Sequence, residues 1–174
     1  MKILKGLSGI FFATAAMAMF GCGGGGGGGG TPQPTTATLK LLSAGPAGTS
    51  IRGIAVKVVL PAGVTVKATP SVTNPAILET NAGVVVLSGA TVANPAAFSQ
   101  LKPIGVYTPA TRTIALNLPA QADFALGEYV TVNTDIAAGN FPTAAGFSLS
   151  EFTAVDLNGA VIPGVTSSIV PDIK

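Results

Sequence analysis

The sequence contains no histidine and no tryptophan, and its 174 residues include a single cysteine. Catalytic groups that pair a serine or cysteine nucleophile with histidine are therefore excluded, because no imidazole can act as the base. Transition-metal sites are disfavoured as well, since they rely on histidine and cysteine ligands. We expect a protein that is not an enzyme and that carries no cofactor.

Charged residues are also scarce, at 9% of the chain against roughly 25% in average soluble domains. Two of the nine basic residues, Lys2 and Lys5, lie at the very start, so the remainder of the chain carries seven basic and seven acidic residues. A neutral body has no electrostatic footprint for a polyanion. Nucleic acid is therefore excluded as a partner.

Hydrophobic residues are abundant, at 48%, although aromatic residues make up only 6%. The apolar content is mostly Ala, Val, Ile and Leu, and it is interleaved with Thr, Gly and Pro. Branched side chains pack well on a pleated surface, and Gly and Pro favour turns. This composition favours strands over helices.

The first residues are typical of a secretory signal. A short basic segment, residues 1–5, precedes an uncharged and mainly apolar run over residues 6–20. This run falls short of the roughly 20 residues that a membrane-spanning helix needs. We therefore predict a signal peptide over residues 1–21.

The end of this segment, Met19-Phe20-Gly21-Cys22, resembles the lipobox of bacterial lipoproteins. The resemblance implies that Cys22 receives a diacylglycerol and becomes the mature N-terminus. Two or more acyl chains suffice for stable membrane anchoring. By the same resemblance, Gly23 in place of the Asp that retains such proteins in the inner membrane favours the outer membrane. The alternative is an ordinary exported protein with a spare thiol.

Residues 22–36 are expected to form a linker. Eight consecutive glycines, residues 23–30, cannot bury apolar surface and predict a flexible coil. Residues 31–36 contain Pro32 and Pro34 and are expected to be stiffer. Together, residues 23–36 would have a root-mean-square reach of roughly 20 Å.

From residue 37 to residue 174 the pattern is one of short β segments separated by turn residues. Ile54, Val56 and Val58 share one face of their segment, which is the period of two expected for a strand. Hairpin turns are predicted at residues 108–113 ("TPATRT") and 157–160 ("LNGA"), and a helical turn at residues 95–100 ("PAAFSQ"). The nine expected strands are 38–43, 51–60, 64–68, 83–88, 104–107, 111–118, 128–136, 147–156 and 161–169.

Nine such strands without alternating helices predict an all-β fold, an antiparallel two-sheet sandwich. Four segments in order, "IRGIAVKVVLPAGVTVKA", "GVVVLSGA", "IGVYTPATRTIALNLPAQADFALGEYVTVNTDIAAG" and "FSLSEFTAVDLNGAVIPGV", resemble cohesin-like domains of bacterial surface proteins. The resemblance covers about residues 37–170 and implies a jelly-roll topology, which some carbohydrate-binding modules share. It also implies a protein-binding or scaffolding role.

The aromatic residues bear on the carbohydrate alternative, because sugars stack on exposed rings. Tyr107 and Tyr129, the only tyrosines, are the candidate ligand-binding residues. Each falls in or beside a predicted strand, where packing at a sheet edge is the simpler interpretation. The phenylalanines of the body are interpreted as core residues or loop plugs: Phe98, Phe124, Phe141, Phe147 and Phe152.

The acidic residues offer two further candidate sites. Asp156 and Asn158, in "DLNG", resemble part of a calcium loop but lack its other oxygen ligands, and a type I′ turn explains the same residues. Asp123 and Glu128 are close enough in sequence to suggest an acid–base pair for glycosidic cleavage. Their segment, "QADFALGEY", is interpreted as a loop that enters a strand.

The sequence therefore predicts a non-catalytic, lipid-anchored protein of the bacterial outer membrane whose sandwich binds another protein. Binding of a polysaccharide by the same sandwich and a role as a structural spacer are the alternatives. The identity of the partner and the side of the membrane stay open.

Overall fold

The computed structural model describes residues 32–98 and 105–174. The predicted signal peptide, Cys22 and most of the linker lie outside these residues. The strands are β1 (Thr36–Ala44), β2 (Ile51–Val59), β3 (Val64–Thr65), β4 (Ala68–Pro70), β5 (Leu78–Thr80), β6 (Val85–Leu87), β7 (Gly105–Thr108), β8 (Thr113–Phe124), β9 (Gly127–Ile136), β10 (Ser148–Val155) and β11 (Thr166–Ile173). Two short helices, α1 (Ala90–Ala93) and α2 (Pro95–Phe98), and a 3-10 turn (Ala144–Gly146) complete the list.

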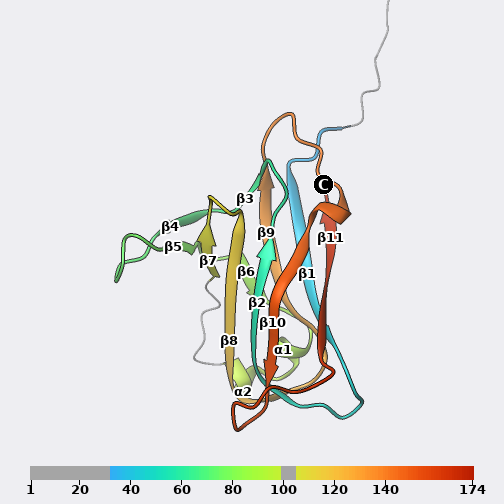
Figure 1. The fold of residues 1–174 in the computed structure, drawn as a ribbon. Coiled ribbons are helices and arrows are strands. Elements are labelled where there is room, and N and C mark those ends of the chain that lie inside the picture. The colour runs from blue at the N-terminus through green and yellow to red at the C-terminus, as the bar shows by residue number, and fades with distance from the viewer. Residues whose placement is uncertain (1–31, 99–104) are drawn as a thin grey trace, which may run out of the picture. The chain divides into compact units, whose positions relative to one another are not determined.

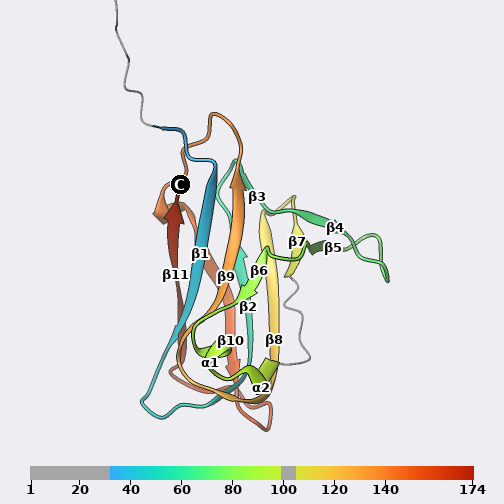
Figure 2. The same cartoon turned by 180° about the vertical axis from the view of Figure 1, so that it is seen from behind.

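The strands form two antiparallel sheets (Figures 1 and 2). The five-stranded sheet has the order β11-β1-β9-β3, and β6 also pairs with β9. The six-stranded sheet has the order β10-β2-β8-β7-β5-β4. The predicted all-β two-sheet sandwich is confirmed, with eleven strands among the described residues in place of about nine. The expected strand over residues 64–68 is in fact two, since β3 joins one sheet and β4 the other.

The core lies between the sheets, and the alternation read from the sequence decides which side chains enter it. Ile54, Val56 and Val58 of β2 are buried, whereas Ala55 between them is exposed. Three phenylalanines belong to the core, and Phe98 packs edge-on against Phe124 with ring centroids 5.2 Å apart. The interpretation of every phenylalanine as a core residue or plug is wrong for Phe141, which is 60% exposed.

The strand that was expected to end at residue 118 continues to Phe124 as β8. The interpretation of "QADFALGEY" as a loop is therefore wrong for its first four residues. Pro119 does not end the strand, because it lies opposite Gly53 where the β2–β8 register shifts. The chain then crosses between sheets within two residues, since β9 begins at Gly127 in the other sheet.

The turns behave differently. The predicted 108–113 turn is confirmed: it joins β7 to β8, and the Arg112 amide donates to the Pro109 carbonyl at 3.1 Å. The predicted 157–160 turn is formed, since the Asp156 amide donates to the Ala160 carbonyl at 3.0 Å, but it does not join two paired long strands. β10 pairs with β2, while β11 pairs with β1 in the other sheet. Only an isolated bridge from Val161 to Val155 follows the turn. The last strand therefore begins at Thr166, beyond Pro163 and Gly164.

Both ends of the described sandwich chain meet at one end of the sheets. The amides of Thr35 and Thr36 donate to the Lys174 carbonyl at 2.6 and 3.0 Å, and the Lys174 amide donates back to Thr36 at 2.9 Å. We call this the linker end, because the predicted linker joins the sandwich here. In the described part of the chain, no helix is long and apolar enough to cross a membrane.

Candidate functional site

The two tyrosines that the sequence suggested as sugar-stacking residues lie in different sheets, Tyr107 on β7 and Tyr129 on β9. Both are buried, with 7% and 0% of their surface exposed. The structure does not bring them together, and neither ring offers an open face to a ligand.

The Tyr129 hydroxyl has a structural partner. Ser167 on β11 donates its hydroxyl hydrogen to the Leu42 carbonyl at 3.0 Å, so Tyr129 must donate to Ser167 across their 2.8 Å contact. Burial of the ring raises the pKa of Tyr129 to about 12. This hydroxyl therefore stays protonated and links β9 to β11 beneath β1.

Asp156 and Asn158, the weak calcium candidates, form a local turn. One carboxylate oxygen of Asp156, Oδ1, accepts the amides of Asn158 and Ala160 at 2.8 and 2.9 Å. Only Gly159 has a positive φ, 77°, so the expected type I′ turn, which needs two such residues, is not formed. No group of three or more His, Cys, Asp or Glu side chains is gathered within residues 32–98 and 105–174.

The two carboxylates considered for acid–base chemistry, Asp123 and Glu128, have separate partners. Asp123 pairs with Arg52 on the six-stranded sheet, and Glu128 pairs with Lys40 at 3.3 Å on the five-stranded sheet. A hydrogen bond from the Ser88 hydroxyl, together with the nearby Lys40 ammonium, lowers the pKa of Glu128. A general acid needs a raised pKa, so Glu128 is unsuited to that role.

A broader candidate is the outer face of the six-stranded sheet, where four neighbouring strands, β10, β2, β8 and β7, present mostly small side chains. Ala55 of β2 lies between Thr153 of β10 and Asn117 of β8. Along the adjacent row, Ala115 of β8 lies beside Val106 of β7. We call this surface the sheet trough: Gly53, Ala55, Val106, Ala115, Asn117, Pro119 and Thr153.

The sheet trough comprises two shallow hollows of about 170 and 360 Å³ that share Ala55 and Asn117. An ion pair lies at each end. Lys57 contacts Glu151 at 2.6 Å, and Arg52 pairs with Asp123. The hollows are lined without an aromatic side chain, as far as the described residues extend. The surface is therefore small, neutral and mostly apolar in its centre, with charge at its margins.

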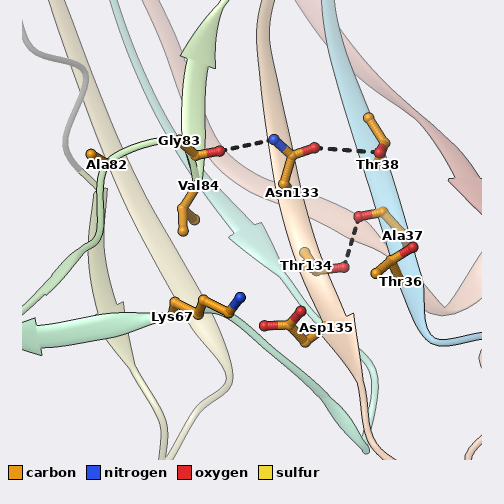
Figure 3. A pocket seen from close by; sticks show the side chains of 10 residues that line it. All are labelled: Thr36, Ala37, Thr38, Lys67, Ala82, Gly83, Val84, Asn133, Thr134 and Asp135. Carbon is orange, nitrogen blue, oxygen red and sulfur yellow. Dashed lines mark hydrogen bonds between the residues drawn. The ribbon is translucent and has the colours of Figure 1, made fainter.

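A second cavity of about 360 Å³ lies near the linker end, between β1, β9 and the segments that precede β4 and β6. Figure 3 shows its polar lining. Asn133 donates to the Gly83 carbonyl at 2.8 Å and accepts from the Thr38 hydroxyl at 3.3 Å. These two hydrogen bonds hold the Asn133 side chain between Thr38 and Gly83, and so fix the shape of this wall of the cavity.

The same cavity contains two facing charges, the Lys67 ammonium and the Asp135 carboxylate, whose ends turn toward each other (Figure 3). Within the described residues, neither takes part in an ion pair of 4.0 Å or less. The arrangement could hold a small polar molecule with groups of both charges. It could equally close into a direct ion pair, since the Lys67 side chain is long and exposed.

The sequence alone indicated neither the sheet trough nor the cavity near the linker end, although some residues of the sheet trough could have been predicted to point outward. Because successive side chains of a strand point to opposite faces of the sheet, Ala55 and Ala115 are each expected on the outward side of their strands. The sequence does not reveal the order of the strands, which brings these two residues onto neighbouring strands at the same hollow. Comparison of the chain with protein-family models, with curated proteins and with solved structures finds no match.

Proposed function

We propose that this chain is a non-catalytic, lipid-anchored envelope protein whose sandwich binds another protein through the sheet trough. The observation that carries the proposal is the outer face of β2 and β8, where Ala55, Ala115 and Asn117 leave the sheet uncovered. Ala and Gly lose no rotamer freedom when they are covered, so a partner can dock there at low entropic cost.

The lining of the sheet trough favours a protein partner over a polysaccharide. Sugars are bound largely by stacking on aromatic rings, and both tyrosines are buried in the core. A protein partner needs apolar area with polar groups at the rim. The ion pairs of Lys57 and Arg52 would provide such a rim and would influence partner choice through charge.

The anchor is supported by the sequence. The signal-like segment ends in Gly21-Cys22, and the eight glycines that follow have the composition of a linker between an anchor and a folded domain. The resemblance to bacterial lipoproteins assigns the lipid to Cys22 and the protein to the outer membrane. The resemblance of residues 37–170 to cohesin-like domains favours the same binding role. Palmitate labelling that is lost in Cys22→Ser tests this part of the proposal.

The docking face is tested by comparing two matched substitutions, each of which places an arginine on an exposed strand alanine. Ala55→Arg fills the sheet trough, whereas Ala44→Arg lies on β1 of the five-stranded sheet. The full-length protein is isolated from cell envelopes after mild cross-linking. We expect its specific partner to be captured by wild type and Ala44→Arg and to be lost with Ala55→Arg.

Three results would count against this function. Capture that survives Ala55→Arg, or that is lost equally with Ala44→Arg, would overturn the sheet trough as the docking face. Retention on insoluble polysaccharide that Ala55→Arg abolishes, with no protein captured, would favour the carbohydrate alternative. Thermal unfolding of each variant shows whether a lost interaction reflects a lost fold.

A further inference from the structure

The linker end carries an uncharged loop with an exposed aromatic side chain. No charged residue occurs between Asp135 and Glu151, and the loop over residues 137–146 consists of Ala, Gly, Asn, Pro, Thr and one Phe. That residue, Phe141, is 60% exposed, while Phe147 at the end of the loop is buried. An exposed phenylalanine in uncharged surroundings is not explained by the core or by the sheet trough.

The loop begins directly beside the point where the linker enters. The amide of Ile136, the last residue of β9, donates to the Thr35 carbonyl at 2.8 Å. The next amide, that of Ala137, donates to the Gly63 carbonyl, also at 2.8 Å. Figures 1 and 2 both show this loop at the end of the sandwich where β1 starts and the C-terminus lies.

Asn140 holds the base of the loop in place. Its side-chain amide donates to the Ala137 and Ala138 carbonyls at 3.1 and 3.3 Å. The same side chain packs against Gly63, where a Cβ would lie 2.1 Å from Asn140 Cγ. Phe141 therefore projects from a braced position, and little ordering would be needed for its ring to meet another surface.

We propose that residues 137–146 contact the bilayer surface, with Phe141 inserted among the lipid headgroups, when the protein is anchored through Cys22. This proposal rests on the anchoring proposed above. From its sequence, the chain between Cys22 and Thr36 would hold the linker end at a root-mean-square distance of roughly 20 Å from its anchor. The loop that carries Phe141 starts at the end of that tether, which makes lipid its nearest large apolar partner.

The tether through Cys22 would allow a weak contact between Phe141 and the bilayer to orient the anchored protein. One phenylalanine ring that leaves water shifts an equilibrium by on the order of tenfold, which is too little to recruit a free protein to a membrane. A flexible tether raises the effective concentration to the millimolar range, so the same contact biases the orientation of a protein that is already bound. The anchored sandwich would then stand with its linker end down and its opposite end outward.

The absence of tryptophan from the sequence and its single cysteine allow a direct test. The expected mature chain, starting at Cys22, is coupled through that thiol to a maleimide lipid in phosphatidylcholine–phosphatidylglycerol vesicles. Phe141→Trp supplies the only tryptophan, and Ala145→Trp repeats the probe on the same loop. Leu157→Trp is the control, because Leu157 is 67% exposed and belongs to the connection between β10 and β11, at the end of the sheets away from the C-terminus (Figure 1).

We expect brominated acyl chains to quench the emission of Phe141→Trp and Ala145→Trp at least twofold more than that of Leu157→Trp. The uncoupled Cys22→Ser form of Phe141→Trp should show no such quenching. Equal quenching at both ends of the sandwich, or none on the loop, would overturn the proposal. Because the coupling is chemical, failure of palmitate labelling in cells would remove the proposed anchor without changing this result.

Discussion

The outer faces of the two sheets differ in what covers them. On the five-stranded sheet, Lys40 pairs with Glu128, and Asn133 bridges β1 to the segment before β6. On the six-stranded sheet, Ala55 and Ala115 occupy the corresponding central positions, and the ion pairs lie only at the margins. On the outer face of the five-stranded sheet, these polar side chains are therefore already paired with groups of the same sheet. The outer face of the six-stranded sheet presents an open and neutral surface.

This difference bears on which face can bind. A partner on the five-stranded sheet would have to replace hydrogen bonds and an ion pair that already exist, at a cost in desolvation. A partner on the six-stranded sheet would cover methyl groups and backbone, with little to displace. Both sheets belong to the same sandwich, and the difference between their outer faces arises only from the side chains that point outward from each strand.

The largest effect is expected from a methyl group added on the inner side of the six-stranded sheet. In Gly105→Ala the new Cβ would lie 2.6 Å from Ile114 Cγ2 and 2.9 Å from Leu116 Cδ2. Such overpacking lowers the free energy of unfolding by about 1–3 kcal/mol. Urea denaturation measures it.

The matched control adds the same methyl group on the outer side. In Gly53→Ala the one close contact of the Cβ would be Val155 Cγ2, at 3.0 Å, since the next atom, the Leu118 carbonyl oxygen, lies at an ordinary 3.7 Å. The gain from replacing a strand glycine offsets that contact. We expect a change within about 0.5 kcal/mol. Equal losses for Gly105→Ala and Gly53→Ala would show that the outer face is as tightly filled as the core.

A middle-sized effect is expected beneath the five-stranded sheet. Tyr129→Phe removes the hydrogen bond to Ser167 and should lower the free energy of unfolding by about 1 kcal/mol at pH 7. Because burial raises the pKa of Tyr129 from 10.0 to about 12, the folded state holds its proton more tightly. Wild type should therefore lose stability as the pH rises from 10 to 12.

The phenylalanine variant should lack that alkaline loss, so the difference in the free energy of unfolding between the two proteins should narrow as the pH rises above 10. Denaturant titrations at pH 7, 10 and 11 test this. A gap between the two proteins that stays constant up to pH 11 would mean that the Tyr129 hydroxyl titrates equally in the folded and unfolded states.

The smallest effect is expected from the outer network of the five-stranded sheet. Glu128→Gln removes an exposed ion pair with Lys40, for which we expect a loss under about 0.5 kcal/mol. Because the pKa of Glu128 is lowered, its contribution is present at neutral pH and disappears as the pH falls below 4.5 through the folded-state pKa. Thermal unfolding at pH 7 and pH 3.5 measures the difference.

A difference between wild type and Glu128→Gln that persists unchanged at pH 3.5 would contradict this account. Partner capture by Glu128→Gln should equal that of wild type, because Glu128 lies on the outer face of the five-stranded sheet and not in the sheet trough. A loss of capture would place the docking surface on the five-stranded sheet.

The central strands could be predicted from the sequence, and the edges could not. Strands such as β2 and β9 alternate strongly because one face is buried along their whole length. The short strands β4 and β5 bury little, so their patterns are weak. The Asn158-Gly159 pair was recognised as a turn, but turn chemistry is local and does not say which sheet the next strand joins.

The candidate site was harder to foresee for a related reason. Catalytic and metal sites are found by residue type, and the sheet trough is made of residue types that carry no such signal. It becomes visible only when β10, β2, β8 and β7 are placed side by side. The two tyrosines are candidates for sugar binding because they are aromatic, but the structure places both in the core.

The most direct test of the docking face is site-specific photo-cross-linking of the anchored protein in intact cells. A benzophenone side chain at Ala115 samples the sheet trough, and one at Thr131 samples the outer face of the five-stranded sheet. The account predicts a discrete protein adduct from position 115 and none from position 131. An adduct from position 131 alone, or the absence of any adduct from position 115, would contradict it.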